Sequence, residues 1–461
     1  MVEYRRGPEG WSAFPRSGRI IAAIMTRREF GQTFVGGAVT AALFPSAGAA
    51  RRQPALRVNG DRLNARLATI GRIGANPQGG VTRLGYSEED RQARAMVVAV
   101  MRDAGLEPAT DFAGNLIGRR AGSDPNLKPL VFGSHVDSVP EGGNFDGNVG
   151  VLASIEVART LRERSTTLRH PIEVAVWANE EGGLFGSRAV SGQFQASELT
   201  HVTASGKTVK DGIAFLGGRP DRVPEVRRSP GDIAGYFELH IEQGGVLEAE
   251  RTTIGIVEGI VGIRWWNVTV TGFANHAGTT PMNRRQDAML AAARFIDMVN
   301  RVVTSAPGGH VGTVGRIRAV PGAPNVIPGT VECSLELRDL DDAQIMRLFE
   351  NIRAEAMRIG DANGTTIAFE ELHVNAPAPS DPRMRQAIAD AAVVLGLSSR
   401  VMPSGAGHDA QAMAQIGPMG MIFIPSVGGI SHSPKEFSHA ADIVHGANVL
   451  LGAVLAADGG R

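Results

Sequence analysis

The 461-residue sequence contains a single cysteine, Cys333. One thiol excludes an intramolecular disulfide and any zinc site built on paired cysteines. Cys333 lies in a run of alternating apolar and polar residues, which predicts a buried structural side chain in a strand. The sequence also lacks an excess of either charge, because Lys and Arg together number 47 and so do Asp and Glu. This balance argues against nucleic acid or an anionic membrane as the main partner.

Long apolar runs are scarce as well. The run at residues 34–44 is too short and too rich in glycine to span a membrane. Arg27 and Arg28 precede it and small residues follow at 46–50, an order typical of an export signal of the twin-arginine type. We therefore predict that residues 1–50 are an N-terminal extension with this signal, and that the mature protein is periplasmic. Met25 is a candidate for the true initiator, and a basic tail on a cytoplasmic protein is the alternative.

The length of the chain predicts two or three domains. Helical patterns at residues 59–71, 87–105 and 149–164 alternate with strand-like runs at 110–118, 130–134, 172–177 and 235–239. Asn59 and Ser87 are positioned to cap the first two helices. Alternation of this kind predicts an α/β domain with a doubly wound sheet.

The pattern changes near residue 262. Strand-like runs at 264–272, 310–320, 329–339 and 364–371 enclose helical patterns at 283–303 and 343–362. This β-α-β-β-α-β order predicts a ferredoxin-like α+β unit. Helical patterns at 381–396 and 408–416 and a strand at 420–425 then resume the first pattern. We expect a domain at 262–375 that is inserted between two parts of the first domain, 51–261 and 376–461.

Side chains suited to metal binding follow strand-like runs at five places: His135, Asp146, Glu181, His240 and His432. Because the carboxyl ends of parallel strands meet at one edge of a sheet, these side chains should lie together. Imidazole and carboxylate groups suit Zn²⁺ or a similar divalent ion. Five ligands exceed the three that a single catalytic zinc normally takes, so the set predicts two metals bridged by Asp146.

Glu180 directly precedes the expected ligand Glu181. Two adjacent acids in a loop cannot usually bind one ion in the same way, so we expect Glu180 to act as the general base that takes a proton from the attacking water. Two solvated loop acids are the alternative. Asp137, two residues after His135, is expected to orient that imidazole through its carboxylate.

Several short motifs carry a resemblance to the M20 metallopeptidase superfamily. They are HVD at residues 135–137, NFDG at 144–147, NEEG at 179–182, ELHIEQG at 238–244, NHAGTTPM at 275–282 and GAGHDA at 405–410. The set most resembles the hydantoinase/carbamoylase branch, which includes N-carbamoyl-L-amino-acid hydrolases, allantoate amidohydrolases and β-ureidopropionases. The resemblance extends over about residues 57–455.

The resemblance implies a zinc-exopeptidase-like catalytic domain with a mixed, mainly parallel sheet, and an inserted lid domain that carries the contact of a homodimer. It implies two divalent metal ions per subunit, Zn²⁺ or alternatively Mn²⁺, Co²⁺ or Ni²⁺. The family's metal ligands fall on the five residues named above and its general base falls on Glu180. Its lid histidine falls on His276, which would reach the partner subunit's site and polarise the scissile carbonyl.

The same resemblance places recognition of a substrate carboxylate on Arg338, together with Asn325. A planar guanidinium suits a bidentate contact with a carboxylate. Arg338 could instead be an ordinary exposed strand residue. Gln243 and His408 are expected to line the site, although His408 could simply cap the helix that follows it.

From these residues we predict hydrolysis of a linear amide or ureido C–N bond in a small substrate that bears a carboxylate. N-carbamoyl-L-amino acids are the leading substrate class, with allantoate as the alternative. An aminoacylase or peptidase of the same superfamily is a further possibility. A catalytically inactive periplasmic binding protein is disfavoured, because Glu180 and all five expected ligands are present.

Overall fold

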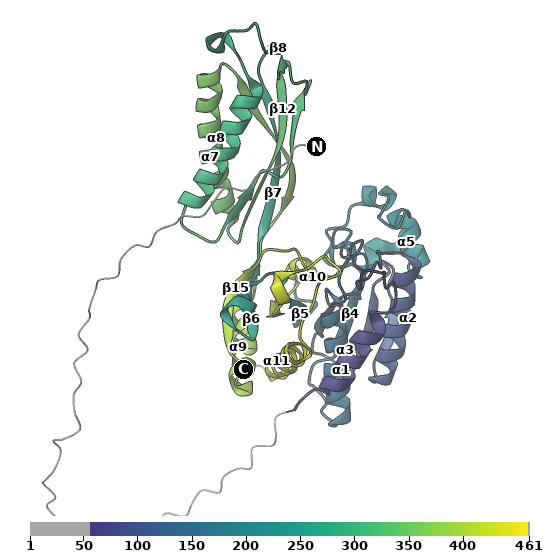
Figure 1. The fold of residues 1–461 in the computed structure, drawn as a ribbon. Coiled ribbons are helices and arrows are strands. Elements are labelled where there is room, and N and C mark those ends of the chain that lie inside the picture. Colours follow the sequence, from purple (N-terminus) through teal and green to yellow (C-terminus); the bar gives the residue numbers. More distant parts are fainter. Residues whose placement is uncertain (1–55, 460–461) are drawn as a thin grey trace, which may run out of the picture. The chain divides into compact units, whose positions relative to one another are not determined.

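The computed structural model describes residues 56–459, and Figure 1 shows their fold. The predicted export signal and the candidate start at Met25 lie outside the described residues and stay predictions. Within residues 56–459 the strands form two main sheets, each with its own buried apolar core.

Nine described strands form the larger sheet in the order β1-β2-β4-β3-β5-β16-β6-β14, with β15 beside β6. Their bounds are β1 Glu107–Thr110, β2 Leu116–Arg120, β3 Leu130–His135, β4 Ile172–Trp177, β5 Gly235–Ile241, β6 Ile254–Ile260, β14 Ala378–Pro379, β15 Ser399–Ser404 and β16 Met419–Ile424. The four central strands β4, β3, β5 and β16 run parallel and are buried along their whole length. Buried parallel strands of this kind need apolar side chains on both faces, which these runs supply.

The sheet is mixed, as predicted, and its buried central strands are the parallel ones. Parallel pairs are β3–β4, β3–β5, β5–β16 and β6–β15, whereas β1–β2, β2–β4, β6–β16 and β6–β14 are antiparallel. The antiparallel pairs lie to either side of the parallel centre. The direction of such short strands depends on how the chain returns to the sheet, which a residue pattern does not record.

Helices cover both faces of this sheet. The long ones are α1 Gly60–Ile70, α2 Glu88–Asp103, α3 Asn148–Glu163, α9 Pro382–Leu395 and α11 Ala440–Asp458, which share one apolar core. Shorter helices are α4 Phe185–Val190, α5 Val209–Phe215, α6 Val246–Glu250 and α10 Asp409–Met413. The predicted caps are confirmed, because the side chain of Asn59 accepts from Arg62 N and that of Ser87 accepts from Asp90 N.

Helix α11 is long and apolar enough to cross a membrane by length and composition alone. It nevertheless packs against α9 and α3 and against strands β16 and β5. Its buried residues, among them Leu450 and Leu451, belong to the core of the larger sheet. Its apolar character is therefore that of a core helix.

The second sheet has the described strand order β10-β12-β7-β13, with β9 also beside β12. Its elements are β7 Gly262–Thr271, α7 Ala288–Ser305, β9 Val311–Thr313, β10 Ile317–Val320, β12 Thr330–Asp339, α8 Asp342–Asn363 and β13 Thr366–Asn375. Helices α7 and α8 cover one face of the sheet (Figure 1). Cys333 is buried in β12 among Val331 and Leu335, which confirms the prediction for this residue.

One strand of this sheet differs from its prediction. The expected single strand at 310–320 is two short strands, which pair with different parts of β12: β9 lies opposite residues 336–338 and β10 opposite residues 330–333. A separate ribbon pairs β8, Asn275–His276, with β11, Val326–Ile327. The chain passes from β6 of the larger sheet to β7 of the second at Val261, and returns to the larger sheet at β14.

Candidate metal centre

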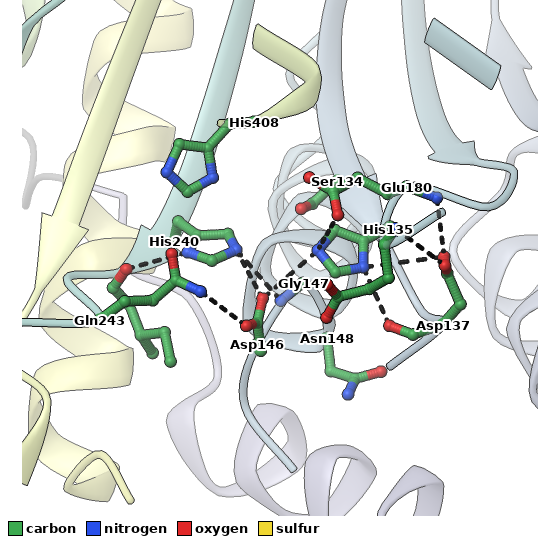
Figure 2. A network of polar contacts seen from close by, with 12 residues as sticks. Ser134, His135, Asp137, Asp146, Gly147, Asn148, Glu180, His240, Gln243 and His408 are labelled. Atoms are coloured by element: carbon green, nitrogen blue, oxygen red, sulfur yellow. Dashed lines mark hydrogen bonds and ion pairs between the residues drawn. The ribbon is translucent and has the colours of Figure 1, made fainter. Parts of the chain in front are cut away.

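The carboxyl ends of the four central parallel strands hold the expected metal-binding side chains. His135 is the last residue of β3, His240 lies in β5, Glu181 follows β4 and His432 follows β16. Asp146 lies in the loop that leads into α3. Figure 2 shows Asp146 between His135 and His240.

The two carboxylate oxygens of Asp146 face two different sets of side chains. Oδ1 lies 3.0 Å from Nε2 of His240 and 3.4 Å from Nε2 of His135. Oδ2 lies 3.3 Å from Nε2 of His432, which in turn lies 3.7 Å from Oε2 of Glu181. We call His135, His240 and Oδ1 of Asp146 the first ligand group, and Glu181, His432 and Oδ2 of Asp146 the second ligand group. Asp146 belongs to both, as the sequence predicted for a bridging carboxylate.

The hydrogen bonds of the two buried imidazoles define how they face Asp146. Nδ1 of His135 lies 3.0 Å from the carbonyl oxygen of Asp137, and Nδ1 of His240 lies 2.9 Å from that of Ile241. A carbonyl oxygen only accepts, so each Nδ1 carries the hydrogen. A neutral ring then turns the lone pair of Nε2 toward a carboxylate oxygen. Two electron-rich atoms at such distances repel unless a cation lies between them.

The electrostatics of the cluster agree with this need for positive charge. Burial opposes charge on His135, but Glu180, Asp146 and Asp137 together raise the pKa of its imidazole well above its ordinary value. Burial likewise opposes ionisation of Asp146, yet His240 and the other imidazoles hold the pKa of Asp146 well below its ordinary value. The cluster therefore attracts either protons or a metal cation.

The residues present fit a divalent metal. Ligand bonds of 2.0–2.2 Å in a tetrahedral arrangement place neighbouring ligand atoms roughly 3.3 Å apart, which is close to the separations within both groups. Oε1 of Glu181 is buried and has no hydrogen-bond partner among the described residues. An orphaned carboxylate oxygen beside an imidazole is the expected state of a ligand that binds a cation.

Glu180 lies beside the first ligand group. Its Oε2 atom is 3.7 Å from Nε2 of His135 (Figure 2). Its side chain is buried. Burial, reinforced by Asp409 and Glu181, raises the pKa of Glu180 well above its ordinary value. A buried carboxyl group that readily holds a proton suits a group that must both accept and return one.

Asp137 acts differently from the prediction. Its carboxylate accepts from the backbone N–H groups of Glu180, at 3.3 Å, and Glu181, at 3.1 Å. The same carboxylate lies 3.8 Å from Nδ1 of His135, whereas the Asp137 carbonyl oxygen is at hydrogen-bond distance. The backbone of Asp137 thus orients His135, and its side chain fixes the loop that presents Glu180 and Glu181.

Gln243 and His408 both lie at the cluster. The amide nitrogen of Gln243 donates to Oδ2 of Asp146 at 2.8 Å, and its Oε1 atom is buried without a partner among the described residues. The ring of His408 packs edge-on against that of His240, with 4.5 Å between centroids. His408 occupies the N-cap position of α10, but its side chain makes no capping bond and instead contacts Ser404 Oγ at 2.9 Å. The helix-cap alternative is therefore wrong.

His408 also belongs to an overlapping group. Among the described residues, ligand atoms of Glu238, His240 and His408 lie within 4.8 Å of one another. Nε2 of His240 already faces Asp146 in the first ligand group. Burial and the nearby His240 hold the pKa of His408 well below its ordinary value, so the ring is neutral.

Sequence reasoning missed two acids that support the cluster. Oε1 of Glu436 accepts from the backbone N–H groups of Phe145 and Asp146, and its Oε2 accepts from Ser431. Glu238 accepts from Ser134 Oγ at 2.7 Å and from Ala410 N at 2.9 Å. Glu238 stands in the ELHIEQG motif, two residues before His240, so the alternation of β5 was a signal for it. Glu436 carries no comparable signal.

The remaining predicted site residues lie in the second sheet and in or beside the β8–β11 ribbon. His276 is exposed on β8, and the backbone N–H of the following residue, Ala277, donates to the carbonyl oxygen of Asn325. His276 and Asn325 are therefore neighbours. Arg338 in β12 bonds to Glu336 Oε1 and to the carbonyl oxygen of Gly405, each at 2.6 Å. No described contact joins His276 to the ligand groups of the same chain.

The chain is similar to one protein family and to several known proteins. Residues 131–456 match the family model described as Peptidase family M20/M25/M40. An N-carbamoyl-L-amino acid amidohydrolase of Geobacillus stearothermophilus is 42% identical over 398 residues, which cover 85% of this chain and 97% of that protein. An allantoate amidohydrolase of Bacillus subtilis is 35% identical over 387 residues, covering 83% and 93%. The crystal structure of an amidase of the hydantoinase/carbamoylase family from Burkholderia multivorans matches with a TM-score of 0.82 at 40% identity, covering 88% of this chain and 99% of that one.

Proposed function

The chain belongs to peptidase family M20/M25/M40, and we propose that it hydrolyses the ureido C–N bond of N-carbamoyl-L-amino acids with two bound divalent metal ions. Its relatives named amidohydrolases act on carbon–nitrogen bonds other than peptide bonds, and so does this enzyme. The observation that carries the proposal is the placement of Asp146 between two ligand groups, with Glu180 beside them.

The two ligand groups would hold one metal each, with Zn²⁺ the ion best suited to imidazole and carboxylate and Mn²⁺, Co²⁺ or Ni²⁺ as alternatives. Metal bound here would polarise the scissile carbonyl and lower the pKa of the attacking water. Glu180 Oε2 accepts the proton of that water. The protonated carboxyl group of Glu180 then delivers the proton to the leaving nitrogen, as burial of this side chain favours.

The products follow from this sequence of proton transfers. Water adds to the carbamoyl carbon, the C–N bond to the amino acid breaks, and the free amine leaves. The carbamic acid that remains decomposes to carbon dioxide and ammonia. Release of both ammonia and the free amino acid is therefore the signature of the proposed reaction.

We further propose that the chain works as a homodimer in which His276 serves the partner subunit's site. His276 is exposed and does not contact the ligand groups of its own chain. An imidazole that donates to the developing oxyanion would contribute several kcal/mol, roughly 3–4 per donor. Arg338 and Asn325 are proposed to bind the substrate carboxylate, which makes the second sheet and its ribbon a lid.

Allantoate is the alternative substrate, favoured by the Bacillus subtilis relative named for it. Allantoate also carries a carboxylate and a ureido C–N bond, so the same groups would act on it. Parallel assays with N-carbamoyl-L-methionine and allantoate decide between the two substrates. No turnover of either by metal-loaded protein would refute the proposal.

Export through the twin-arginine signal at residues 1–50 is a separate proposal that rests on the sequence alone. Mass spectrometry of the N-terminus of the protein from periplasmic and cytoplasmic fractions tests it. Cleavage close to residue 50 supports export, and an intact extension on all of the protein contradicts it.

A further inference from the structure

Arg83 is a fully buried arginine whose described hydrogen-bond partners are all neutral. Burial lowers the pKa of Arg83 to about 10, although the charges of Asp90 and Asp137 oppose this shift. Removing a cation from water without pairing it to an anion is costly, so it is retained where its hydrogen bonds serve a purpose. The contacts of Arg83 show what that purpose is.

The guanidinium of Arg83 joins three separate segments of the chain. Its Nε atom donates to the carbonyl oxygen of Val136, the residue after β3, at 2.5 Å. One terminal nitrogen donates to Oδ1 of Asn148, the first residue of α3, at 3.0 Å. The other donates to the carbonyl oxygens of Ile70 at 3.0 Å and Ile73 at 2.8 Å. A planar guanidinium with five N–H groups can bind such divergent acceptors at once.

The contacts with the end of α1 have a structural explanation. Ile70 is the last residue of α1, and a cation beside the C-terminal carbonyl groups of a helix stabilises that helix. The bonds to Val136 and Asn148 are not explained in this way, because neither residue belongs to α1. Val136 directly follows the ligand His135, and Asn148 follows the ligand Asp146 by two residues.

Beside His135, Arg83 holds the segment that orients the imidazole. Nδ1 of His135 lies 3.0 Å from the carbonyl oxygen of Asp137. Arg83 fixes the residue on either side of Asp137. Its guanidinium binds the carbonyl oxygen of Val136, and its backbone pairs with Ser138, whose N–H donates at 2.8 Å and whose Oγ accepts at 2.9 Å. The peptide group that orients the His135 ring is therefore bracketed by bonds to one residue.

Beside Asp146, the connection passes through Asn148. Oδ1 of Asn148 accepts from Arg83, and its Nδ2 donates to the carbonyl oxygen of Asn144 at 3.3 Å. Asn148 is buried, and its side chain points away from the metal-binding side chains (Figure 2). The two ends of the segment that holds Asp146 are thus joined to each other and to Arg83.

One side chain therefore connects both parts of the first ligand group. We propose that Arg83 is a positioning residue that keeps the imidazole of His135 and the carboxylate of Asp146 at the separation a bound metal ion requires. Nε2 of His135 and Oδ1 of Asp146 lie 3.4 Å apart. The described hydrogen bonds of Arg83 reach neither of these side chains, so it acts through the backbone and Asn148. The inference rests on the metal sites of the proposed function and not on the identity of the substrate.

Other contacts hold the second ligand group. The carboxylate of Asp137 accepts from the backbone N–H of Glu181. Glu436 accepts from the hydroxyl of the residue before His432. The described hydrogen bonds of Arg83 reach neither Glu181 nor His432. Loss of the Arg83 side chain should therefore weaken the first ligand group more than the second, even though the two groups share one carboxylate.

Arg83→Lys tests this difference when it is combined with variants that keep one ligand group each. A lysine keeps the charge, but its donors sit on one nitrogen and cannot reach three segments. His432→Ala leaves the first ligand group complete, and His240→Ala leaves the second complete. Each background then retains three protein ligands, which is the number that a zinc site with an open position uses.

The affinity for zinc, measured by competition with a chromophoric chelator, is independent of activity. Adding Arg83→Lys to His432→Ala should lower the zinc affinity at least about tenfold. Adding Arg83→Lys to His240→Ala should lower it less than about threefold. A general loss of stability would lower both affinities alike, so the difference between the two backgrounds separates positioning from a structural role.

Arg62→Lys is the matched control for loss of a hydrogen-bonded guanidinium. Arg62 binds the carboxylates of Glu156 and Glu163, which lie more than two turns beyond Asn148 in α3. Arg62→Lys should lower the urea midpoint of unfolding and change the zinc affinity less than about twofold in both backgrounds.

Equal losses of affinity in the two backgrounds, or no loss in His432→Ala, would overturn the positioning role. If either background binds no zinc, the zinc content after dialysis at a low free zinc concentration decides. Arg83→Lys should then retain about one ion per chain where the parent protein retains about two. Full zinc content in Arg83→Lys would contradict the inference.

Asn148→Leu is the second variant if Arg83→Lys does not fold. It removes the connection to the Asp146 segment alone and should weaken zinc binding about tenfold in the His432→Ala background. Unchanged affinity there would also contradict the inference.

Failure of the inference and failure of the proposed function give different results. A parent protein that binds no divalent metal ion would refute both. A parent protein that binds two ions and hydrolyses a ureido substrate, with equal effects of Arg83→Lys on the two ligand groups, would leave the proposed function intact and remove the positioning role alone.

Discussion

Nε2 of His240 lies 3.0 Å from Oδ1 of Asp146, although Nδ1 of the same ring already donates to Ile241. A neutral His240 has no second hydrogen to place between the two atoms. The backbone N–H of Gly147 donates to the same Nε2 at 3.3 Å, which offsets only part of the repulsion, so a proton or a metal cation stabilises the pair. This relationship, repeated by His135, is the strongest structural reason to place metal at the carboxyl edge of the parallel strands.

Asp146→Asn should weaken metal binding by both ligand groups, because the substitution removes the charge that both groups share. We expect the zinc content to fall from about two to below one per chain, and kcat to fall more than about a hundredfold. Metal analysis together with turnover of N-carbamoyl-L-methionine checks both. Asp232→Asn at the exposed pair with Lys128 is the matched control and should change neither.

Glu180→Gln should lower kcat about a hundredfold to ten-thousandfold, because the amide cannot accept the proton of the attacking water. KM and metal content should stay close to those of the parent, since Glu180 is not assigned to either ligand group. Steady-state kinetics with metal-loaded protein give both parameters. A Glu180→Gln variant with ordinary kcat would remove Glu180 from the mechanism.

Mixing two inactive variants tests whether His276 serves the partner subunit. His276→Ala and Glu180→Gln should each be nearly inactive alone. In a mixed dimer, one site receives an intact Glu180 from its own chain and His276 from the other chain. Random reassociation of equal amounts should restore about a quarter of the parent activity. No recovery in a preparation shown to contain mixed dimers would contradict the shared site.

Metal affinity should rise with pH from about 7 to 9. The hydrogen bond to Asp146 raises the pKa of His432 to about 9 in the absence of metal, and burial together with Asp146 raises that of Glu181 to about 7. Both groups must lose a proton before they bind a cation, so protons compete with metal below these values. Zinc titrations at several pH values, with proton release measured in two buffers, test the competition.

The same pKa shifts predict how the stability of the metal-free protein changes with pH. Folded Glu181 and folded His432 hold protons at pH values where the unfolded chain has released them. The folded state therefore binds more protons between the ordinary and the raised pKa values, and this contribution to stability falls as pH rises through about 9. Urea unfolding of metal-free protein at pH 6 and pH 9 should show a lower midpoint at the higher pH.

Much of the site could be predicted from the sequence because its ligands follow runs with a clear strand pattern. His135, Glu181 and His240 are at the ends of buried apolar strands, and parallel packing brings such ends together. The role of Asp146 followed from the number of ligands. The substrate roles of Gln243, Asn325, Arg338 and His408 stay predictions, since no contact with substrate is described.

Other features depend on contacts between distant residues and left no pattern to interpret. Strands β6 and β15 pair with each other across more than a hundred residues, and neither was predicted as a strand of the larger sheet. The side chain of Arg83 bonds to the carbonyl oxygen of Val136, 53 residues away, and that of Glu436 to the backbone of Phe145 and Asp146, 291 and 290 residues away. In the sequence alone, a buried polar residue of this kind cannot be distinguished from a polar residue on the surface.

The most direct test of the central claim is release of ammonia and free amino acid from N-carbamoyl-L-methionine, N-carbamoylglycine, allantoate, β-ureidopropionate and N-acetyl-L-methionine by zinc- or manganese-loaded protein. The account predicts faster turnover of N-carbamoyl-L-methionine than of allantoate or N-acetyl-L-methionine, with loss of turnover in Glu180→Gln. Cleavage of N-acetyl-L-methionine alone, or full activity in Glu180→Gln, would contradict it.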